Sequence, residues 1–183
     1  MQEIDKIDKV IADLLVEDGR MSAAEIARRI GGVTERVVRY RIDRLVETGV
    51  IRISAIPNPK ELGLAVVADI KVQVEPGRAL QVARQLAQYE FVTYVGCSIG
   101  EGDIGIQVVA PDNEFLYRFS TEILGNVPGV QKTTTMIVPI ILKDIYQWTI
   151  PEGLVSEVET SFEELISSKH DRSQPDGSSQ ANA

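Results

Sequence analysis

This chain of 183 residues has very little sulfur or imidazole chemistry, because it contains one cysteine, Cys97, and one histidine, His170. A single cysteine cannot form an internal disulfide or a cysteine cluster. A single histidine argues against a histidine-based metal site and against a catalytic dyad. We therefore expect no metal, no cofactor and no catalytic residue, and a protein that is not an enzyme.

Long apolar segments are also missing. No uninterrupted apolar run approaches the roughly 20 residues that a membrane span needs, and the N-terminal sequence MQEIDKIDKV is charged from its third residue, unlike a signal peptide. The hydrophobic fraction of 44% is nevertheless enough for packed cores, which excludes wholesale disorder. We expect a soluble cytoplasmic protein without a membrane partner, built as one large domain or two small ones.

Basic residues are the minority, with 19 Lys and Arg against 27 Asp and Glu, which gives a net charge of −8. Residues 20–52 reverse this balance, because they hold 8 basic residues, all of them arginine, and 4 acidic ones. One basic island in an acidic chain keeps the attraction for polyanions local. The planar fork of arginine suits phosphate groups and guanine edges better than the point charge of lysine.

The first fifty residues have the hydrophobic spacing of three helices. The first helix is amphipathic over residues 4–15. The second begins at a predicted capping box formed by Ser22 and Glu25, and the third begins at Thr34 and ends at Gly49. A helix, a short helix, a tight turn and a further helix make the helix-turn-helix layout. Residues 1–52 are therefore predicted to form a helix-turn-helix DNA-binding domain.

The third helix separates into an inner and an outer face at about 100° per residue. Val38, Ile42 and Leu45 face the predicted core, and Arg41 beside them is expected to be an orienting residue in an ion pair. The N-terminal half of a recognition helix enters the major groove. Predicted contacts to base edges come from Glu35, Arg36, Arg39 and Tyr40, with Thr34 at the helix start, and predicted phosphate contacts come from Arg28, Arg29 and Arg44. The alternative is a solvated basic face on a small helical domain.

The rest of the chain alternates strands and helices after a linker at residues 53–63, which contains Pro57-Asn58-Pro59. Residues 64–143 are predicted to form a second domain. Its predicted strands cover residues 64–74, 91–99, 104–110 and 130–142, and its predicted helices cover residues 78–89 and 111–124. This βαββαβ order is the ferredoxin-like arrangement, so the fold class is α+β. Two helices would cover one face of the sheet, and we expect the other face to be apolar and covered by a second copy, sheet to sheet.

Residues 144–183 leave this pattern. Residues 151–168 carry an apolar stripe at helical spacing and begin with Pro151, which suits a first helical turn, so an extra amphipathic C-terminal helix is predicted within an extension at residues 144–168. We expect this helix to pack on its own dimer or on a partner. Residues 169–183 are rich in Ser, Gln and Asp and are expected to be disordered.

The chain resembles the leucine-responsive regulatory protein/AsnC (Lrp/AsnC) family of prokaryotic transcriptional regulators over about residues 3–143. In the first domain the resemblance is carried by Ile4-Asp5 and Asp8, Asp18-Gly19-Arg20-Met21-Ser22, Glu25-Ile26-Ala27, Val38-x-x-Arg41-Ile42-x-Arg44-Leu45 and Gly49-Val50-Ile51. In the second domain it is carried by residues 100–103, Val127-Pro128-Gly129-Val130 and Thr133-Thr134-Thr135. Together these spaced elements are specific, although each one alone is weak.

The resemblance implies a winged or simple helix-turn-helix that binds double-stranded DNA, and a RAM or ACT-like second domain that forms homodimers and higher homo-oligomers. It also implies that small effectors, typically amino acids, bind near the loop between the second and third strands. Here that loop is Gly100-Glu101-Gly102-Asp103, and Gly102 replaces the aromatic residue that the family usually has. Asp103 can accept an ammonium group from a ligand, and Thr133 and Thr135 can line a polar site. A plain tight turn and simple β propensity are the alternatives.

The main prediction is a sequence-specific transcriptional regulator whose two symmetric helix-turn-helix units meet the half-sites of a pseudo-palindrome. One alternative is an enzyme of related architecture, such as the siroheme decarboxylases, which need histidines near the substrate. The only histidine here, His170, lies in the predicted tail. The other alternative is a ligand-sensing or assembly module that does not bind DNA, and the arginine-rich third helix argues against it.

Overall fold

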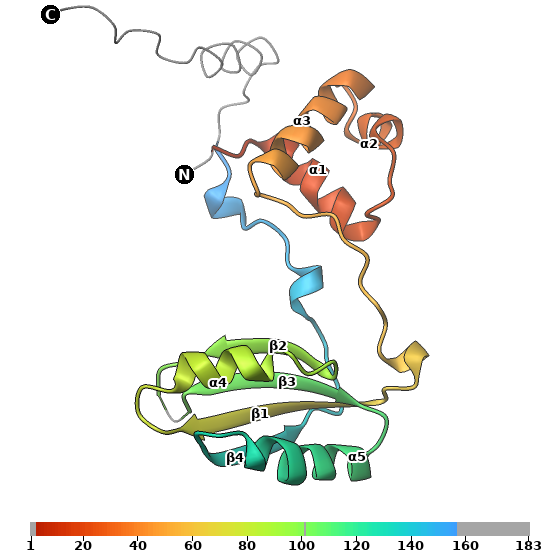
Figure 1. Cartoon of the computed structure of the whole chain (residues 1–183). Coiled ribbons are helices and arrows are strands. Elements are labelled where there is room, and N and C mark those ends of the chain that lie inside the picture. Colours follow the sequence, from red (N-terminus) through yellow and green to blue (C-terminus); the bar gives the residue numbers. More distant parts are fainter. Residues whose placement is uncertain (1–2, 101, 157–183) are drawn as a thin grey trace, which may run out of the picture. The chain divides into compact units, whose positions relative to one another are not determined.

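A computed structural model describes residues 3–100 and 102–156, which fall into two compact units (Figure 1). Of the described residues, one unit contains 3–55 together with 143–156, and the other contains 56–100 and 102–142. The sequence-based division sets residues 144–168 apart as an extension. The structure instead joins the described part of that extension, up to residue 156, to the helical unit.

The helical unit contains α1 (Lys6–Glu17), α2 (Ala23–Ile30) and α3 (Glu35–Glu47), which confirms the three predicted helices. Asp5, Ser22 and Thr34 cap these helices, each accepting a hydrogen bond from a backbone N–H three residues on. The reciprocal capping box forms at α1, between Asp5 and Asp8, and not at α2. At α2 only the Ser22 half of the predicted box is present, because the Glu25 carboxylate binds arginines instead.

The helices enclose a small apolar core. Its buried residues are Ile4, Ile11, Ile26, Ala27, Val38 and Leu45, and Ile150 packs against them from the C-terminal segment. Among the described residues, no strand occurs between α3 and β1. The unit is a simple helix-turn-helix, without a wing among the described residues.

The predicted C-terminal helix does not begin at Pro151. The described residues instead form two short 3-10 turns, Ile145–Gln147 and Glu152–Leu154, and Ser156 then forms a parallel β-bridge with Asp5. The remainder of that predicted helix and the tail at residues 169–183 lie outside the described residues.

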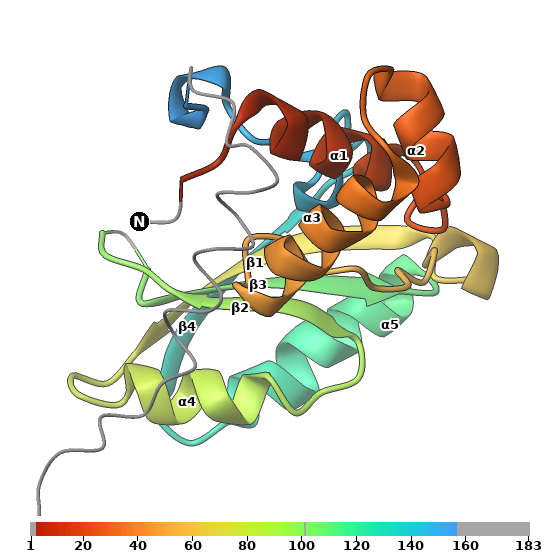
Figure 2. The same ribbon diagram turned by 90° about the horizontal axis from the view of Figure 1, so that it is seen from above.

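The second unit has the predicted βαββαβ order. It contains β1 (Val66–Val74), α4 (Ala79–Leu86), β2 (Val92–Cys97), β3 (Ile104–Ala110), α5 (Asn113–Arg118) and β4 (Val130–Ile137). A π-helical turn (Phe119–Ile123) and a 3-10 turn (Leu124–Asn126) continue α5. The four strands pair in the antiparallel order β2-β3-β1-β4, and α4 and α5 cover the same face of the sheet (Figure 2).

The face opposite the helices is not apolar as predicted. Ala68, Ile70, Val72 and Val74 alternate along β1 and are all buried under the helices. The residues between them are therefore on the open face, and they are Asp69, Lys71 and Gln73. Asp69 there accepts a hydrogen bond of 3.2 Å from Gln107 of β3. The same register pairs Val67 with Val109 and Asp69 with Met136 on this side, so the open face mixes polar and apolar residues.

The last strand is shorter than predicted, because it ends at Ile137 rather than at residue 142. Pro139 follows soon afterwards and has no N–H to donate to a neighbouring strand. Ile140, Ile141 and Leu142 are exposed as a result. Among the described residues, no helix is both long enough and apolar enough to cross a membrane.

Candidate nucleic-acid interface

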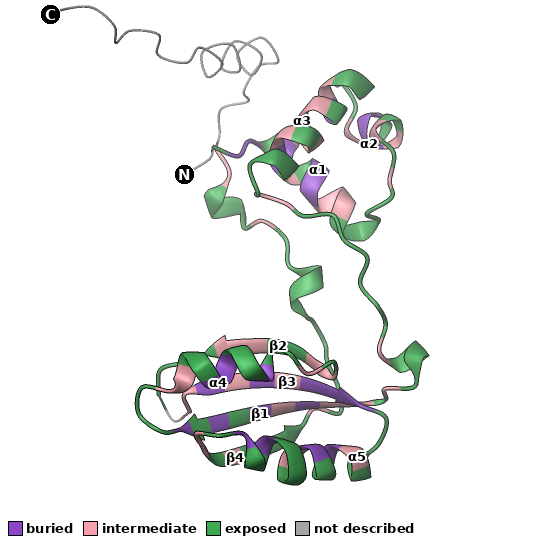
Figure 3. Ribbon diagram, viewed as in Figure 1, coloured by how far each residue is buried: buried purple, intermediate pink, exposed green. Residues whose placement is uncertain are grey.

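The outer face of α3 presents the residues that the sequence assigns to base contacts. Glu35, Arg36 and Arg39 are exposed and Tyr40 is half-buried, and helical spacing brings them together in the first two turns of α3. Figure 3 shows that α3 has both exposed and buried stretches. Thr34 precedes them, and its hydroxyl accepts a hydrogen bond of 3.3 Å from the backbone N–H of Val37. The hydroxyl of Thr34 therefore caps the N-terminus of α3.

One ion pair crosses this outer face. The guanidinium of Arg39 binds the carboxylate of Glu35, one helical turn earlier. The two side chains are 67% and 49% exposed, and exposed pairs of this kind stabilise a fold by at most about 1 kcal/mol. Arg39 can therefore leave Glu35 for a base edge or a phosphate at little cost.

A second basic group lies on α2. Arg28 and Arg29 bind the carboxylate of Glu25 at 2.6 and 3.0 Å, and Arg29 also binds Glu17 at 3.1 Å. Hydrogen bonds from Arg28 and Arg29 hold the pKa of Glu25 below its ordinary value, and the Glu25 carboxylate raises the pKa of both arginines. These exposed carboxylates occupy donors that a DNA phosphate would otherwise take.

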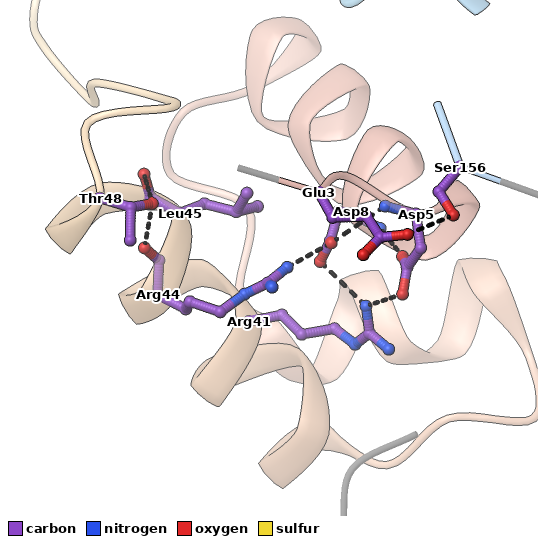
Figure 4. A network of polar contacts seen from close by, with 8 residues as sticks. All are labelled: Glu3, Asp5, Asp8, Arg41, Arg44, Leu45, Thr48 and Ser156. Carbon is purple, nitrogen blue, oxygen red and sulfur yellow. Dashed lines mark hydrogen bonds and ion pairs between the residues drawn. The ribbon is translucent and has the colours of Figure 1, made fainter. Parts of the chain in front are cut away.

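The inner side of α3 is held by a buried network of charged groups, shown in Figure 4. The guanidinium of Arg41 donates hydrogen bonds of 2.6 Å to Asp5 and 2.9 Å to Asp8, which lie at the start of α1. Asp5 is fully buried and the Arg41 side chain is 2% exposed. Burial lowers the pKa of Arg41, but the bonds to Asp5 and Asp8 outweigh it, so the pKa rises. Arg41 is thus the ion-paired, orienting residue predicted from the sequence.

Arg44 belongs to the same network rather than to the outer face. Its guanidinium binds the second carboxylate oxygen of Asp8, and its side chain is only 15% exposed. The predicted phosphate contact of Arg44 does not fit this geometry, because releasing the side chain would leave part of the Asp8 charge buried without its partner. The helical spacing of α3 places Arg44 beside the outer face, but it carries no information about Asp8, which lies 36 residues away in the chain.

Sequence reasoning missed the structural role of Asp5 and Asp8. Both residues carry the family resemblance, but their partners on α3 lie 33 to 36 residues away in the chain. The available signal was the combination of two aspartates three residues apart at a helix start and an arginine on the inner side of α3. Such a charge on a core face needs a buried partner.

In the predicted effector loop, Asp103 is used to hold the backbone. Its carboxylate accepts a hydrogen bond of 2.8 Å from the N–H of Val74, and its own N–H donates to the carbonyl of Val72 at 3.0 Å. The Ser98 hydroxyl donates to the carbonyl of Gly102 at 2.7 Å. Glu101 lies outside the described residues. The loop is thus fastened to the end of β1, which limits what Asp103 can offer to a ligand.

Gly102 is not required by the backbone. Gly100 has a positive φ of 132°, whereas Gly102 does not, and a Cβ atom at Gly102 would lie 3.5 Å from the Cβ of Lys71. That distance is an ordinary van der Waals contact, so the loop can carry a side chain at this position.

The two predicted threonines do not join this loop. Thr133 pairs with Val72 and Thr135 with Ile70, so both lie on the helix-covered side of β4. The Oγ1 atom of Thr135 is 3.1 Å from the Oγ atom of Ser120 beside α5. Asp103 bonds to β1 on the side where β3 pairs with it, whereas Thr133 and Thr135 belong to β4, which pairs along the other side of β1. Within one chain, β1 separates the loop from these threonines.

Both units match known protein families. Residues 4–46 match the AsnC-type helix-turn-helix domain, and residues 67–147 match the Lrp/AsnC ligand binding domain. Among the described residues, no group of three or more His, Cys, Asp or Glu side chains is placed to hold a metal ion.

Archaeal relatives align with most of the chain. It is 43% identical over 142 residues to an uncharacterized HTH-type transcriptional regulator of Pyrococcus horikoshii, covering 77% of this chain and 89% of that protein. It is 35% identical over 136 residues to the HTH-type transcriptional regulator LrpA of Pyrococcus abyssi, covering 74% and 96% of the two chains.

Solved structures share the fold. A Neisseria meningitidis transcriptional regulator in complex with L-Met gives a TM-score of 0.75 at 23% identity, covering 83% of this chain and 99% of that one. Escherichia coli AsnC gives a TM-score of 0.72 at 24% identity, covering 79% and 99%. With both domains matched in order and relatives aligned over nearly their full length, the chain belongs to the Lrp/AsnC family.

Proposed function

We propose that this chain regulates transcription by binding specific sequences in double-stranded DNA through the outer face of α3. The observation that carries the proposal is the contrast between the two sides of that helix. Arg36 and Arg39 are exposed on the outer side, whereas Arg41 is buried and ion-paired on the inner side. An arginine fork that reaches a base edge can read guanine, and a helix fixed from behind presents it in a defined orientation.

Phosphate contacts supply the affinity that does not depend on sequence. Arg28 and Arg29 lie on the exposed side of α2, the helix that precedes the recognition helix. In a helix-turn-helix the preceding helix crosses the DNA backbone, which places these two side chains near phosphates. When Arg28 and Arg29 exchange the Glu25 carboxylate for a DNA phosphate, each guanidinium group still has an anionic partner. Each such contact releases counterions, so binding weakens as the salt concentration rises.

We further propose that the protein acts as a homo-oligomer in the cytoplasm, where prokaryotic DNA is accessible. A symmetric pair of α3 helices matches a pseudo-palindromic site, and one chain supplies only one of them. The open face of the sheet, which carries Asp69 and Lys71 beside Val67 and Val109, can form reciprocal contacts with a second copy. The homologous regulators carry names that denote transcription regulation and not catalysis, so we assign binding as the activity.

Modulation by an amino acid is the second part of the proposal. The ligand-binding domain of the family covers residues 67–147, and a structurally similar regulator was crystallised with L-Met. In this chain a Cβ atom at Gly100 would meet nothing within 4 Å, which leaves room for a ligand group beside the loop. Because Thr133 and Thr135 lie across β1, a ligand that meets both parts needs residues from more than one chain.

The test is selection of bound sequences from random duplexes by the full-length protein, with and without amino acids, at a stated salt concentration. We expect one enriched motif with two-fold symmetry. Arg28→Ala should lower the slope of log affinity against log salt concentration by about 1 without changing that motif. Arg20→Ala is the matched control, because it removes the same charge from a side chain that is 95% exposed and outside the proposed contacts.

Two other outcomes would redirect the assignment. Absence of any enriched motif, with full folding, would favour the assembly module that does not bind DNA. A shift in siroheme absorbance when the protein is titrated into siroheme would favour the decarboxylase alternative, whose one candidate histidine, His170, lies outside the described residues.

A further inference from the structure

The described end of the chain packs on the DNA-binding unit. Ile150 contacts the apolar core of the helices. The backbone N–H of Ser156 donates a hydrogen bond of 2.7 Å to the carbonyl of Ile4, and its hydroxyl donates one of 3.0 Å to the carboxylate of Glu3. The carboxylate of Glu152 lies 3.3 Å from the ammonium of Lys9 on α1. Residues 150–156, which we call the C-terminal strap, thus hold the start of α1.

The strap lies directly beside the buried charge network. Asp5 forms the β-bridge with Ser156, caps α1 and binds the guanidinium of Arg41 at 2.6 Å. A displacement of residues 3–5 would therefore move the Asp5 carboxylate, and with it the anchor of α3. Figure 4 shows the Ser156 hydroxyl in contact with Glu3, and Asp5 and Asp8 in contact with the guanidinium of Arg41.

We propose that the C-terminal strap positions the recognition helix. It holds residues 3–5, and these residues fix the orientation of α3 through Asp5 and Asp8. The strap lies outside both regions that match family models, which end at residues 46 and 147, so the family match does not account for it. The proposal rests on the proposed function, because its consequence is how well the protein distinguishes its specific DNA sequence from other sequences.

The decisive variant is Ser156→Pro, which removes the N–H that binds the carbonyl of Ile4. Val155 has φ −94° and ψ 127°, the extended conformation that residues before proline prefer, so the substitution suits the chain that precedes it. Ser156→Ala is the matched control, because it keeps the backbone bond to Ile4 and removes the hydroxyl that contacts Glu3. Ile150→Ala is a second variant that loosens the strap through its apolar contact.

The affinities of the full-length variants for the selected duplex and for a scrambled duplex are compared well below the melting temperature. We expect Ser156→Pro to weaken binding to the selected duplex about five-fold, the effect of one lost hydrogen bond, with binding to the scrambled duplex unchanged. Ile150→Ala should act in the same direction, and Ser156→Ala should stay close to the parent. Equal binding by all variants, or equal loss on both duplexes, would leave the strap as a purely stabilising element.

A readout without DNA separates this proposal from the proposed function. The guanidinium signals of Arg41 in NMR spectra should shift and exchange faster in Ser156→Pro than in Ser156→Ala. If the parent protein binds no duplex, the proposed function fails, and the Arg41 signals still decide whether the strap acts on the network. Unchanged signals would overturn the proposal whatever the protein binds.

Discussion

The two units bury different kinds of side chain. The buried core of the sheet unit is entirely apolar among the described residues, from Ala68 on β1 to Val127 before β4. The helical unit buries fewer apolar residues, and it also buries the charged residues Asp5, Asp8 and Arg41. Apolar packing stabilises without direction, whereas buried ion pairs add little net stability but specify geometry. The unit that must aim a helix is therefore the one that contains the directional contacts.

The largest expected effect is that of Arg41→Ala. It removes the cation between two buried carboxylates, so the helical unit should lose about 3–5 kcal/mol of unfolding free energy. The sole tryptophan, Trp148, belongs to this unit, and its fluorescence during urea unfolding reports the loss. Arg20→Ala, on an exposed side chain, should change the value by less than about 0.5 kcal/mol. A loss below about 1 kcal/mol in Arg41→Ala would mean that the network does not hold this unit together.

A core truncation in the sheet unit gives the corresponding measurement on the apolar side of the comparison. Leu86 on α4 is fully buried, and Leu86→Ala should cost about 3 kcal/mol because it leaves a cavity. Circular dichroism should show the sheet unit unfolding at a lower urea concentration, while the unfolding transition seen by Trp148 fluorescence should not shift. A parallel shift of both transitions would show that the two units unfold together.

A smaller effect is expected at the loop after β2. Asp103→Ala removes the acceptor for the Val74 N–H and should destabilise the sheet unit by about 1–2 kcal/mol. Asp103→Asn keeps an acceptor oxygen and should cost less. Calorimetric titration with amino acids on both variants tests the proposed ligand role. Loss of ligand binding in Asp103→Asn with intact stability would show that the charge of Asp103 serves the ligand and not only the backbone.

The smallest effect concerns the exposed pairs on α2. Glu25→Gln removes a carboxylate that competes with phosphates for Arg28 and Arg29, so binding to any duplex should tighten by about two-fold at low salt. Hydrogen bonds from Arg28 and Arg29 keep the pKa of Glu25 below its ordinary value of 4.5, so Glu25 stays charged from pH 5 to 8. Affinity titrations should therefore show no pH dependence from this group in that range. Weaker binding by Glu25→Gln would show that the carboxylate orients the arginines for DNA.

Local spacing predicted much of the fold. The 3.6-residue period placed Val38 and Leu45 inside and Arg36 and Arg39 outside, and alternating apolar residues placed β3 at residues 104–110. The errors arose where partners lie far apart in the chain. The inward direction of Arg44 depends on Asp8, and the mixed polarity of the open face depends on the register of β1 against β3 and β4.

Within the predicted C-terminal helix, the described residues 151–156 do not form an α-helix for a related reason. Its apolar residues have helical spacing, but Ile150 is used in the core of the helices and Ser156 pairs with the start of α1. Periodicity describes the amphipathic character of a segment and not the surface that receives it. Long-range pairing with residues 3–5 therefore overrode the local helical preference up to residue 156.

The base preference of Arg36→Ala tests the central claim most directly. Selection from random duplexes by the full-length parent and variant, at one salt concentration, compares the two motifs position by position. The outer face of α3 predicts that Arg36→Ala relaxes the preference at one base position of each half-site, with a cost of about 1–3 kcal/mol for the preferred base. An unchanged motif with a uniform loss of affinity across all sequences would contradict base reading by this face.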